Sequence, residues 1–251
     1  MTHISINQFE FICYCWIALA ILTFLALLFI RQPYGRHVRA GFGFMINNKL
    51  GWVVMEIISP LAFNFFFLSG QIEHTPTHWL FFALFNLHYF KRSIIFPLRT
   101  KTKDKKIPFT IVFSAILFNC VNGFINGYYL GNFQCKTSSY LLITIGFVLF
   151  IAGFYINNKS DDILIALRKD GSSDYKIPNG FLFNKITSPN YFGEIIEWLG
   201  FFVMTMNIAS LAFLIWSLAN LIPRARDHHS WYKKTFQEYP PERKIIFPYL
   251  Y

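Results

Sequence analysis

Six long apolar segments divide this chain and restrict its fold more than any other feature of the sequence. Each is long enough to cross roughly 30 Å of lipid hydrocarbon as a helix. Because 54% of the residues are hydrophobic and only 14% are charged, the chain is too apolar for an ordinary soluble domain. The sequence therefore predicts an all-α, polytopic membrane protein. The apolar segments cover residues 9–30, 50–69, 78–98, 108–130, 139–157 and 192–222.

Positive charge in the connecting segments predicts how these helices are oriented. Residues 31–49 and 99–106 are rich in Arg and Lys, whereas residues 70–77 and 131–138 hold only Glu73 and Lys136 as charged groups. Basic loops stay in the cytosol, which places the N-terminus outside. Residues 158–191 and the C-terminal tail are also basic, so both ends of the last apolar segment should be cytosolic.

Two cytosolic ends require the last apolar segment to cross the membrane an even number of times. A helical hairpin that turns near Met206 and Asn207 satisfies this requirement with two helices of about 22 Å each. We therefore expect a seven-helix transmembrane bundle with the N-terminus outside and the C-terminus cytosolic. A single tilted sixth span is the alternative.

Ionisable side chains inside the second and third apolar segments indicate a functional site. Such a residue near the membrane centre costs about 2.5–3.5 kcal/mol, so it usually has a function and a partner. A rise of 1.5 Å per residue places Glu56 about 9 Å, Arg92 about 10 Å and Tyr89 about 15 Å from the cytosolic boundary. The three can meet as a catalytic site, or Glu56 and Arg92 can neutralise each other while Tyr89 bonds a backbone carbonyl. We expect the neighbouring His88 to pack or to act as a more distant donor.

Two further carboxylates, Glu194 and Glu197, open the last apolar segment. Ser188 can cap this helix with Pro189 in its first turn, and a helix N-terminus binds phosphate well. Just before it, residues 161–168 suggest a short amphipathic surface helix ended by Gly171, and residues 171–180 suggest a loop. The basic run after residue 224 is either a solvated cationic face or a set of donors for an anion.

Other polar groups suggest structural roles. The fourth apolar segment alternates amides with glycines, which is typical of close helix packing. His74 and His78 stand four residues apart but lack further ligands, so we expect them to be solvated and predict no metal site. The four cysteines predict neither a disulfide framework nor a metal centre. The net charge of +10 suits anionic lipid headgroups, and we expect no nucleic-acid partner.

Motifs along most of the chain resemble the steroid 5α-reductase family. They are PYGRH at 33–37, LHYFKR at 87–92, INNKSDDILIALRK at 156–169, YKIPNGFLF at 175–183, SPNYFGEIIEWLGF at 188–201, the run at 224–232, and EYPPERKIIFPYLY at 238–251. The resemblance implies an NADPH-dependent oxidoreductase that reduces the Δ4 double bond of 3-oxo-Δ4-steroids. It implies that residues 1–130 bind a steroid or sterol-like substrate and that residues 131–251 bind NADPH. We expect the chain to be a monomer among membrane lipids.

The resemblance also assigns residues to roles. In that family a Gln–Glu pair and a Tyr hold the substrate carbonyl; Glu56 and Tyr89 match them, and Met55 stands in place of the Gln. Lys176 stands where the family often has Arg, which keeps the charge but loses bidentate geometry. The implied cofactor-binding residues are Asn157, Asp161, Arg168, Tyr175, Asn190, Glu194, Arg224, His228 and Tyr232, together with Tyr34, Arg36 and Arg92.

These roles suggest a mechanism. Hydride attack on the β-carbon of an enone needs fixed donors for the negative charge that develops on the carbonyl oxygen. Tyr89 can supply one, and Glu56 another if burial keeps it protonated. Asn190 and Glu194 are expected to hold the nicotinamide amide, whereas Glu197 is expected to pair with Lys91 or Arg92.

The sequence leaves three alternatives open. A related reductase could act on trans-2-enoyl thioesters or a polyprenol with similar cofactor residues. A membrane methyltransferase that binds S-adenosylmethionine would show a tail Arg followed by paired Glu residues, which RARDHHSWYKK at 224–234 does not contain. A non-enzymatic lipid-binding or scaffold protein would leave Glu194 and Glu197 without a purpose.

Overall fold

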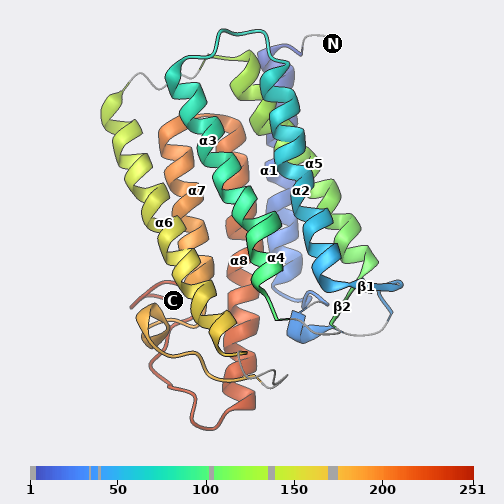
Figure 1. Ribbon diagram of the computed structural model, residues 1–251, viewed down its shortest axis with the longest axis vertical. Helices are drawn as coiled ribbons and strands as arrows, with labels where there is room; N and C mark the ends of the chain where they lie inside the picture. Colours follow the sequence, from blue (N-terminus) through green and yellow to red (C-terminus); the bar gives the residue numbers. More distant parts are fainter. Residues whose placement is uncertain (1–3, 34, 39–40, 102–104, 135–138, 169–174) are drawn as a thin grey trace. The chain divides into compact units, whose positions relative to one another are not determined.

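The chain folds mainly into helices, with one pair of short strands (Figure 1). The computed structural model describes all residues except 1–3, 34, 39–40, 102–104, 135–138 and 169–174. Two compact units can be distinguished. The first contains Met1–Cys13, Gln32–Lys136 and Asn207–Ala209, and the second contains Tyr14–Arg31, Thr137–Met206 and Ser210–Tyr251.

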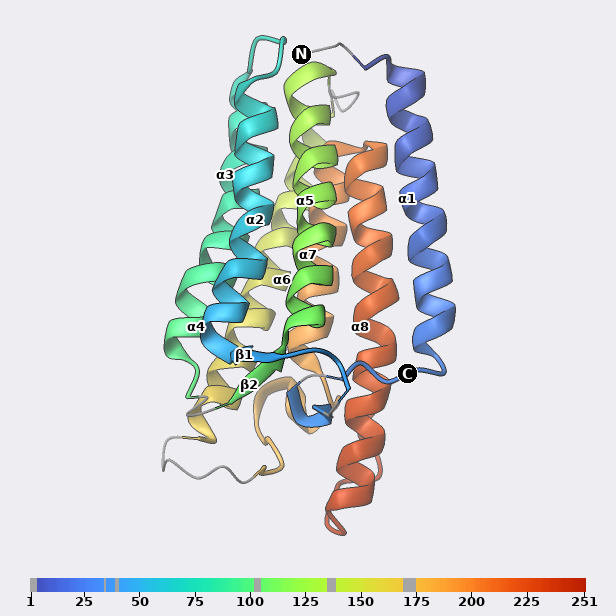
Figure 2. The same ribbon diagram turned by 90° about the vertical axis from the view of Figure 1, so that its right-hand side faces the viewer.

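Three long helical segments form the first unit, and Figures 1 and 2 show α2 beside both α3 and α5. The segment that begins with α3 runs without a break into α4, but a five-residue π-helix between the two changes its winding. The elements are the start of α1 (Ile6–Leu27), η1 (Gly35–His37), β1 (Met45–Asn47), α2 (Asn48–Leu68), α3 (Pro76–Phe90), the π-helix η2 (Lys91–Ile95), α4 (Phe96–Arg99), β2 (Lys106–Pro108) and α5 (Phe109–Asn132).

Close packing of α5 on α2 confirms the prediction made from the amides and glycines of the fourth apolar segment. A Cβ added at Gly123 or Gly127 would collide with the α2 backbone at Ser59 or Phe63. Glycine is therefore needed for the two backbones to approach this closely. The amide of Asn119 uses this proximity and donates to the Met55 carbonyl at 2.7 Å, within the turn that Pro60 weakens because it has no N–H.

A small antiparallel ribbon was not predicted. Strands β1 and β2 pair Met45 with Pro108 and Asn47 with Lys106, and each strand leads directly into a helix. Three residues are too few to show an alternating pattern in the sequence. The side chain of Asn47 then begins α2 by accepting from the Lys49 and Leu50 amides.

The second unit contains the remainder of α1, α6 (Tyr140–Ala166), η3 (Phe181–Asn184), α7 (Pro189–Thr205) and nearly all of α8 (Ile208–Thr235). Helix α7 ends at Thr205, and the next residue, Met206, adopts a left-handed conformation with φ 44° and ψ 46°, so the predicted turn at Met206 and Asn207 is confirmed. The predicted length of about 22 Å is wrong for α8. Its 28 residues extend about 42 Å, because the helix continues through the basic run that follows Pro223.

Two local predictions for this unit are corrected. Helix α6 continues without a break to Ala166, so no separate amphipathic helix forms; neither Gly nor Pro interrupts residues 154–168. Gly171, the expected helix end, lies outside the described residues. Ser188 precedes α7 as predicted, but its side chain makes no capping hydrogen bond.

The histidines near the turn before α3 are not solvated, contrary to expectation. His78 is buried and forms a reciprocal capping box with Thr75, and His74 stacks on Phe67 with ring centroids 4.2 Å apart. His74 Nε2 also lies 3.1 Å from the Phe67 carbonyl oxygen at the end of α2, so the two histidines help to fix the start of α3.

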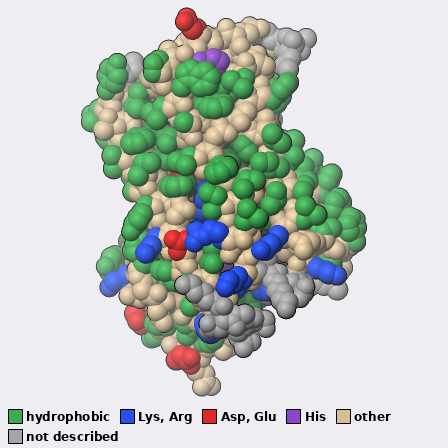
Figure 3. All heavy atoms as spheres, in the orientation of Figure 1, with side chains coloured by type: hydrophobic (Ala, Val, Ile, Leu, Met, Phe, Trp, Pro, Cys, Tyr) green, Lys and Arg blue, Asp and Glu red, His purple; other side chains and the backbone are tan. Residues whose placement is uncertain are grey.

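Within the described part of the chain, five helices are long and apolar enough to cross a membrane by length and composition: α1, α2, α5, α6 and α8. Hydrophobic side chains cover much of the face drawn in Figure 3, and many on α1 and α6 are exposed, as expected for helices that face lipid. The chain is thus a multi-pass membrane protein. Seven crossings and the orientation of the termini stay predictions.

Candidate functional site

An ion pair joins the two charged residues that the sequence placed at one depth. Arg92 Nε lies 3.5 Å from Glu56 Oε1, and the two side chains are only 16% and 13% exposed. The Arg92 guanidinium also lies over the Trp52 ring, 4.8 Å from its centroid. This pair therefore sits in a largely dry, aromatic part of the first unit.

The hydroxyl of Tyr89 meets an amide of α5. Asn122 Nδ2 donates to Tyr89 Oη at 3.1 Å, and both side chains are buried. The Tyr89 ring packs against Phe85 and, edge to face, against His88, with centroids 4.9 and 5.0 Å away. The phenol is held in one place by packing and by hydrogen bonding. His88 therefore packs on Tyr89, which is one of the two roles expected for it.

The π-helix gives Tyr89 and Arg92 their relative directions. Ser93 Oγ donates to the Tyr89 carbonyl at 2.6 Å, a bond that competes with the backbone ladder, and Phe96 N bonds the Lys91 carbonyl five residues back. Single π-turns occur often at functional sites. Nothing in the residue pattern indicates this turn except Pro97, which removes one backbone donor from the next turn.

In the second unit, α6 and α7 bring three of the implied cofactor residues together. Asn157 Nδ2 donates to the Asn190 carbonyl at 3.0 Å, and Asn190 Nδ2 lies 3.4 Å from Asp161 Oδ1. Glycines permit this contact, since a Cβ at Gly193 would lie 2.5 Å from Asn157 N. Asn157 and Asp161 are each only 3% exposed.

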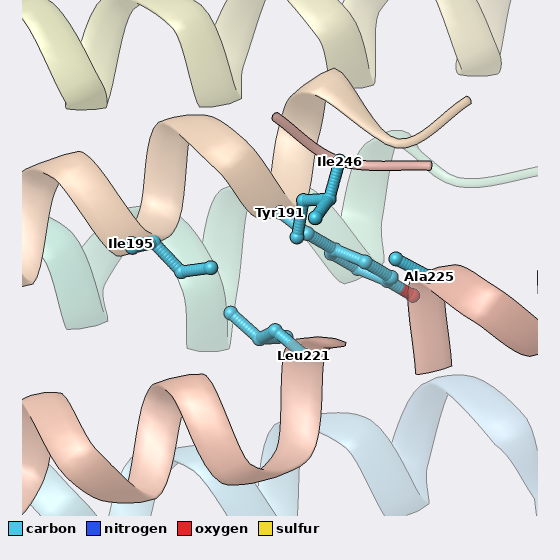
Figure 4. Packing of buried hydrophobic residues seen from close by; sticks show 5 residues of the cluster. All are labelled: Tyr191, Ile195, Leu221, Ala225 and Ile246. Carbon is cyan, nitrogen blue, oxygen red and sulfur yellow. The ribbon is translucent and has the colours of Figure 1, made fainter. Parts of the chain in front are cut away.

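Tyr191 connects the start of α7 to an arginine and a histidine of α8. The Arg224 guanidinium lies 5.7 Å from the Tyr191 ring centroid, and the His228 ring lies 5.6 Å away. Figure 4 shows the apolar cluster of Tyr191, Ile195, Leu221, Ala225 and Ile246 that holds the two helices together here. Tyr191 was not among the predicted site residues, although it stands between Asn190 and Glu194.

The two carboxylates of α7 differ in their surroundings. Glu194 Oε2 is buried and has no hydrogen-bond partner among the described residues, so it is an acceptor that a bound ligand could satisfy. Glu197 is completely buried. Its expected pairing with Lys91 or Arg92 stays a prediction, since those residues belong to the other unit.

Aromatic residues surround the remaining implied contacts near the end of α8. The Arg168 guanidinium lies 5.5 Å from the Tyr175 ring centroid, and Tyr175 packs edge to face on Trp231. Tyr232 is buried and stacks on Tyr239 at 5.4 Å. The basic run is therefore not a solvated face. Arg36 lies in η1, and Tyr34 lies outside the described residues.

A hydrogen-bonded cluster just before α7 was not predicted at all. Thr187 Oγ1 lies 2.5 Å from His229 Nδ1 and 2.7 Å from Tyr239 Oη, and it donates to the Lys244 carbonyl at 3.1 Å. Burial raises the pKa of the Tyr239 hydroxyl above its usual range, so this group stays neutral. Arg243, from the C-terminal segment, donates to the Pro178 carbonyl and to Asn179 Oδ1. These residues join α8 and the C-terminal segment to the start of α7.

Comparison with known proteins agrees with the resemblance seen in the motifs. The family model for 3-oxo-5-alpha-steroid 4-dehydrogenase matches residues 105–251. Steroid 5-alpha-reductase DET2 of Gossypium hirsutum is 37% identical, over 95% of this chain and 96% of that protein. DET2 of Arabidopsis thaliana is 38% identical over 91% of each chain. Human 3-oxo-5-alpha-steroid 4-dehydrogenase 1 is 35% identical, over 87% and 86%. The chain therefore belongs to the steroid 5α-reductase family of oxidoreductases.

Proposed function

We propose that this protein reduces the Δ4 double bond of 3-oxo-Δ4-steroids to 5α-3-oxosteroids within a membrane, with NADPH as the reductant. The observation that carries the proposal is the buried Tyr89 phenol in the same apolar unit as the Glu56–Arg92 pair, in a chain related along almost its whole length to steroid 5α-reductases. A fixed donor in a dry site is what reduction of an enone requires.

The reaction balances as enone plus NADPH plus one proton, giving saturated ketone and NADP⁺. NADPH, when bound, supplies the hydride that reaches C5. Negative charge then develops on the substrate's carbonyl oxygen, where the Tyr89 hydroxyl donates to it. Water supplies the proton that C4 takes up.

Glu56 is the second residue assigned to the carbonyl. It can donate to the carbonyl only while it is protonated, and Arg92 Nε, 3.5 Å from Glu56 Oε1, holds the carboxyl group in place. Tyr89 is therefore the principal donor in this proposal, and Glu56 with Arg92 fixes the polar end of the substrate pocket. Met55 is buried beside Glu56 and cannot supply the amide that the family's Gln provides.

The residues of the second unit fit NADPH in their chemistry. Arg168 and Arg224 supply cations for phosphate groups, and the buried Glu194 Oε2 supplies an acceptor for the nicotinamide amide. We assign the remaining contacts to Asn157, Asp161, Tyr175, Asn190, His228 and Tyr232. The contacts that the family resemblance implies for Tyr34, Arg36 and Arg92 stay predictions. Residues 1–130 are assigned to the substrate and residues 131–251 to the cofactor.

The deciding experiment uses the full chain purified in lipid nanodiscs. NADPH with testosterone or progesterone should lose both the NADPH absorbance and the enone absorbance in equal amounts, and the product should carry a 5α hydrogen. The same assay with a trans-2-enoyl thioester and with a polyprenol tests the two related reductase activities. Turnover of either of these without turnover of a steroid, or NADPH binding without turnover of any 3-oxo-Δ4-steroid, would overturn the proposal.

A further inference from the structure

The phenol of Tyr89 receives a hydrogen bond from a residue that neither the motifs nor the charges of the sequence singled out for chemistry. Asn122 lies on α5 and is completely buried, and its Nδ2 donates to Tyr89 Oη at 3.1 Å. The same nitrogen lies 3.5 Å from Ser59 Oγ on α2. One amide thus links three helical segments at the hydroxyl group to which the proposed function assigns the substrate carbonyl.

The direction of this amide follows from a backbone carbonyl. Asn126 lies 3.0 Å from the Asn122 carbonyl oxygen, which can only accept, so the group that Asn126 turns toward it must be its NH₂. That NH₂ also lies 3.2 Å from the other end of the Asn122 side chain, which must therefore be the oxygen. The NH₂ of Asn122 consequently faces Tyr89, and the flipped arrangement would place donor against donor.

A hydroxyl that accepts from a fixed donor has its own hydrogen directed elsewhere. Because Asn122 occupies one acceptor direction of the Tyr89 oxygen, the O–H bond must rotate toward a different acceptor. Donation by the amide also stabilises the phenol oxygen as negative charge builds on it, so the phenol becomes a stronger donor. Both effects favour a hydrogen bond from Tyr89 to a carbonyl oxygen.

We propose that Asn122 is a positioning residue that orients and strengthens the Tyr89 hydroxyl toward the substrate's carbonyl oxygen, with Asn126 fixing the direction of the Asn122 amide. This inference rests on the proposed reduction and adds a residue to it. A purely structural reading competes with it, since Asn122 also adjoins Gly123, where α5 packs on α2. The two readings differ in whether the effect of Asn122 depends on the Tyr89 hydroxyl.

A double-mutant cycle separates them. Asn122→Leu is made in the wild-type chain and in Tyr89→Phe, and kcat, KM and the Kd for NADPH are measured on the full chain in nanodiscs, with single-turnover assays for slow variants. In the wild-type background kcat should fall roughly 10- to 100-fold, while the Kd for NADPH stays unchanged. In the Tyr89→Phe background the further loss should be less than about threefold, because no hydroxyl remains to be oriented.

Two further variants complete the design. Asn132→Leu is the matched control, since Asn132 lies on the same helix and donates to its own Tyr128 carbonyl; its kcat should equal that of the wild type. Asn122→Asp keeps the size of the side chain and, when ionised, can only accept, so it should capture the Tyr89 hydrogen and lower kcat at least as much as Asn122→Leu. It also provides the test if the leucine variant does not fold.

Each outcome bears on one claim. Equal losses in both backgrounds, or an unchanged kcat for both Asn122 variants, would overturn the positioning role and leave the proposed reduction standing. No turnover of any 3-oxo-Δ4-steroid by the wild-type chain would overturn the proposed function itself, and the inference with it.

Discussion

Arg92 Nε lies 3.5 Å from Glu56 Oε1 across the space between η2 and α2, and both side chains are largely buried. Removing one member of such a pair leaves an uncompensated charge in a dry site, which costs about 3–5 kcal/mol. Arg92 has further support from the Trp52 and Phe96 rings, whose centroids lie 4.8 and 5.5 Å away. The pair is therefore expected to hold η2 in register with α2.

Substitution of Glu56 tests what the carboxyl group does. Glu56→Gln keeps an oxygen acceptor for Arg92 and an amide donor for a carbonyl, so it should retain clearly more activity than Glu56→Ala, measured as kcat/KM for a 3-oxo-Δ4-steroid. Glu56→Ala should lose about 100-fold or more, as expected when a polar group at the reacting carbonyl is removed. Equal and complete loss in both variants would count against a role for Glu56 as a neutral donor.

Glu194 should contribute to NADPH affinity through its buried oxygen. Glu194→Leu removes the acceptor that lacks a partner within the described chain, and the Kd for NADPH should rise about tenfold or more, as expected for a lost hydrogen bond to a charged group. Quenching of tryptophan fluorescence on titration with NADPH measures this. Glu238→Gln is the control, because Glu238 is exposed, and its Kd should match the wild type. An unchanged Kd for Glu194→Leu would remove Glu194 from the cofactor site.

Much of the fold could be predicted because hydropathy alone decides which segments enter lipid. The apolar segments, the start of α7 at Pro189 and the turn at Met206 all follow from local residue types. The length of α8 and the continuity of α6 do not, since packing lets a helix continue through polar sequence. Ala225 and Tyr232 are buried in the basic run, for which a solvated cationic face was one of the two interpretations of the sequence.

The site was only partly predictable for a similar reason. Helical spacing placed Glu56 and Arg92 at one depth, and the structure pairs them. The bond between Asn122 and Tyr89 depends on how α5 is rotated against α3, and no spacing within one segment encodes that rotation. The role of Thr187 could not be predicted because a single threonine forms no sequence pattern, and its partners His229 and Tyr239 lie 42 and 52 residues further along the chain.

Thr187 should matter for stability more than its size suggests. Thr187→Val keeps the shape of the side chain but removes the hydroxyl that joins His229, Tyr239 and the Lys244 carbonyl. Buried groups left without partners cost about 1–3 kcal/mol each, so the Tm in detergent should fall by about 4–10 °C. Thr144→Val removes an exposed hydroxyl that bonds its own helix and should leave the Tm within about 1 °C. A similar Tm for both variants would show that the cluster is not needed for stability.

The contact between α6 and α7 should tolerate no side chain at Gly153. A Cβ there would lie 2.5 Å from the Gly193 carbonyl oxygen and 2.7 Å from the Glu197 Cα, so Gly153→Ala forces the two helices apart. Asn157 stands one turn further along α6 and bonds the Asn190 carbonyl, so the separation should weaken NADPH binding as well as lower the Tm. Ala152→Leu is the matched control. Ala152 is the exposed neighbour of Gly153, so a leucine there adds more volume than the alanine at 153 but lies on the exposed side of α6.

Thermal unfolding with and without NADPH measures both effects. The Gly153→Ala variant should have a lower Tm and a smaller NADPH-induced increase in Tm, and the Ala152→Leu variant should match the wild type in both. If Gly153→Ala retained the full increase, the α6–α7 contact would have no part in cofactor binding.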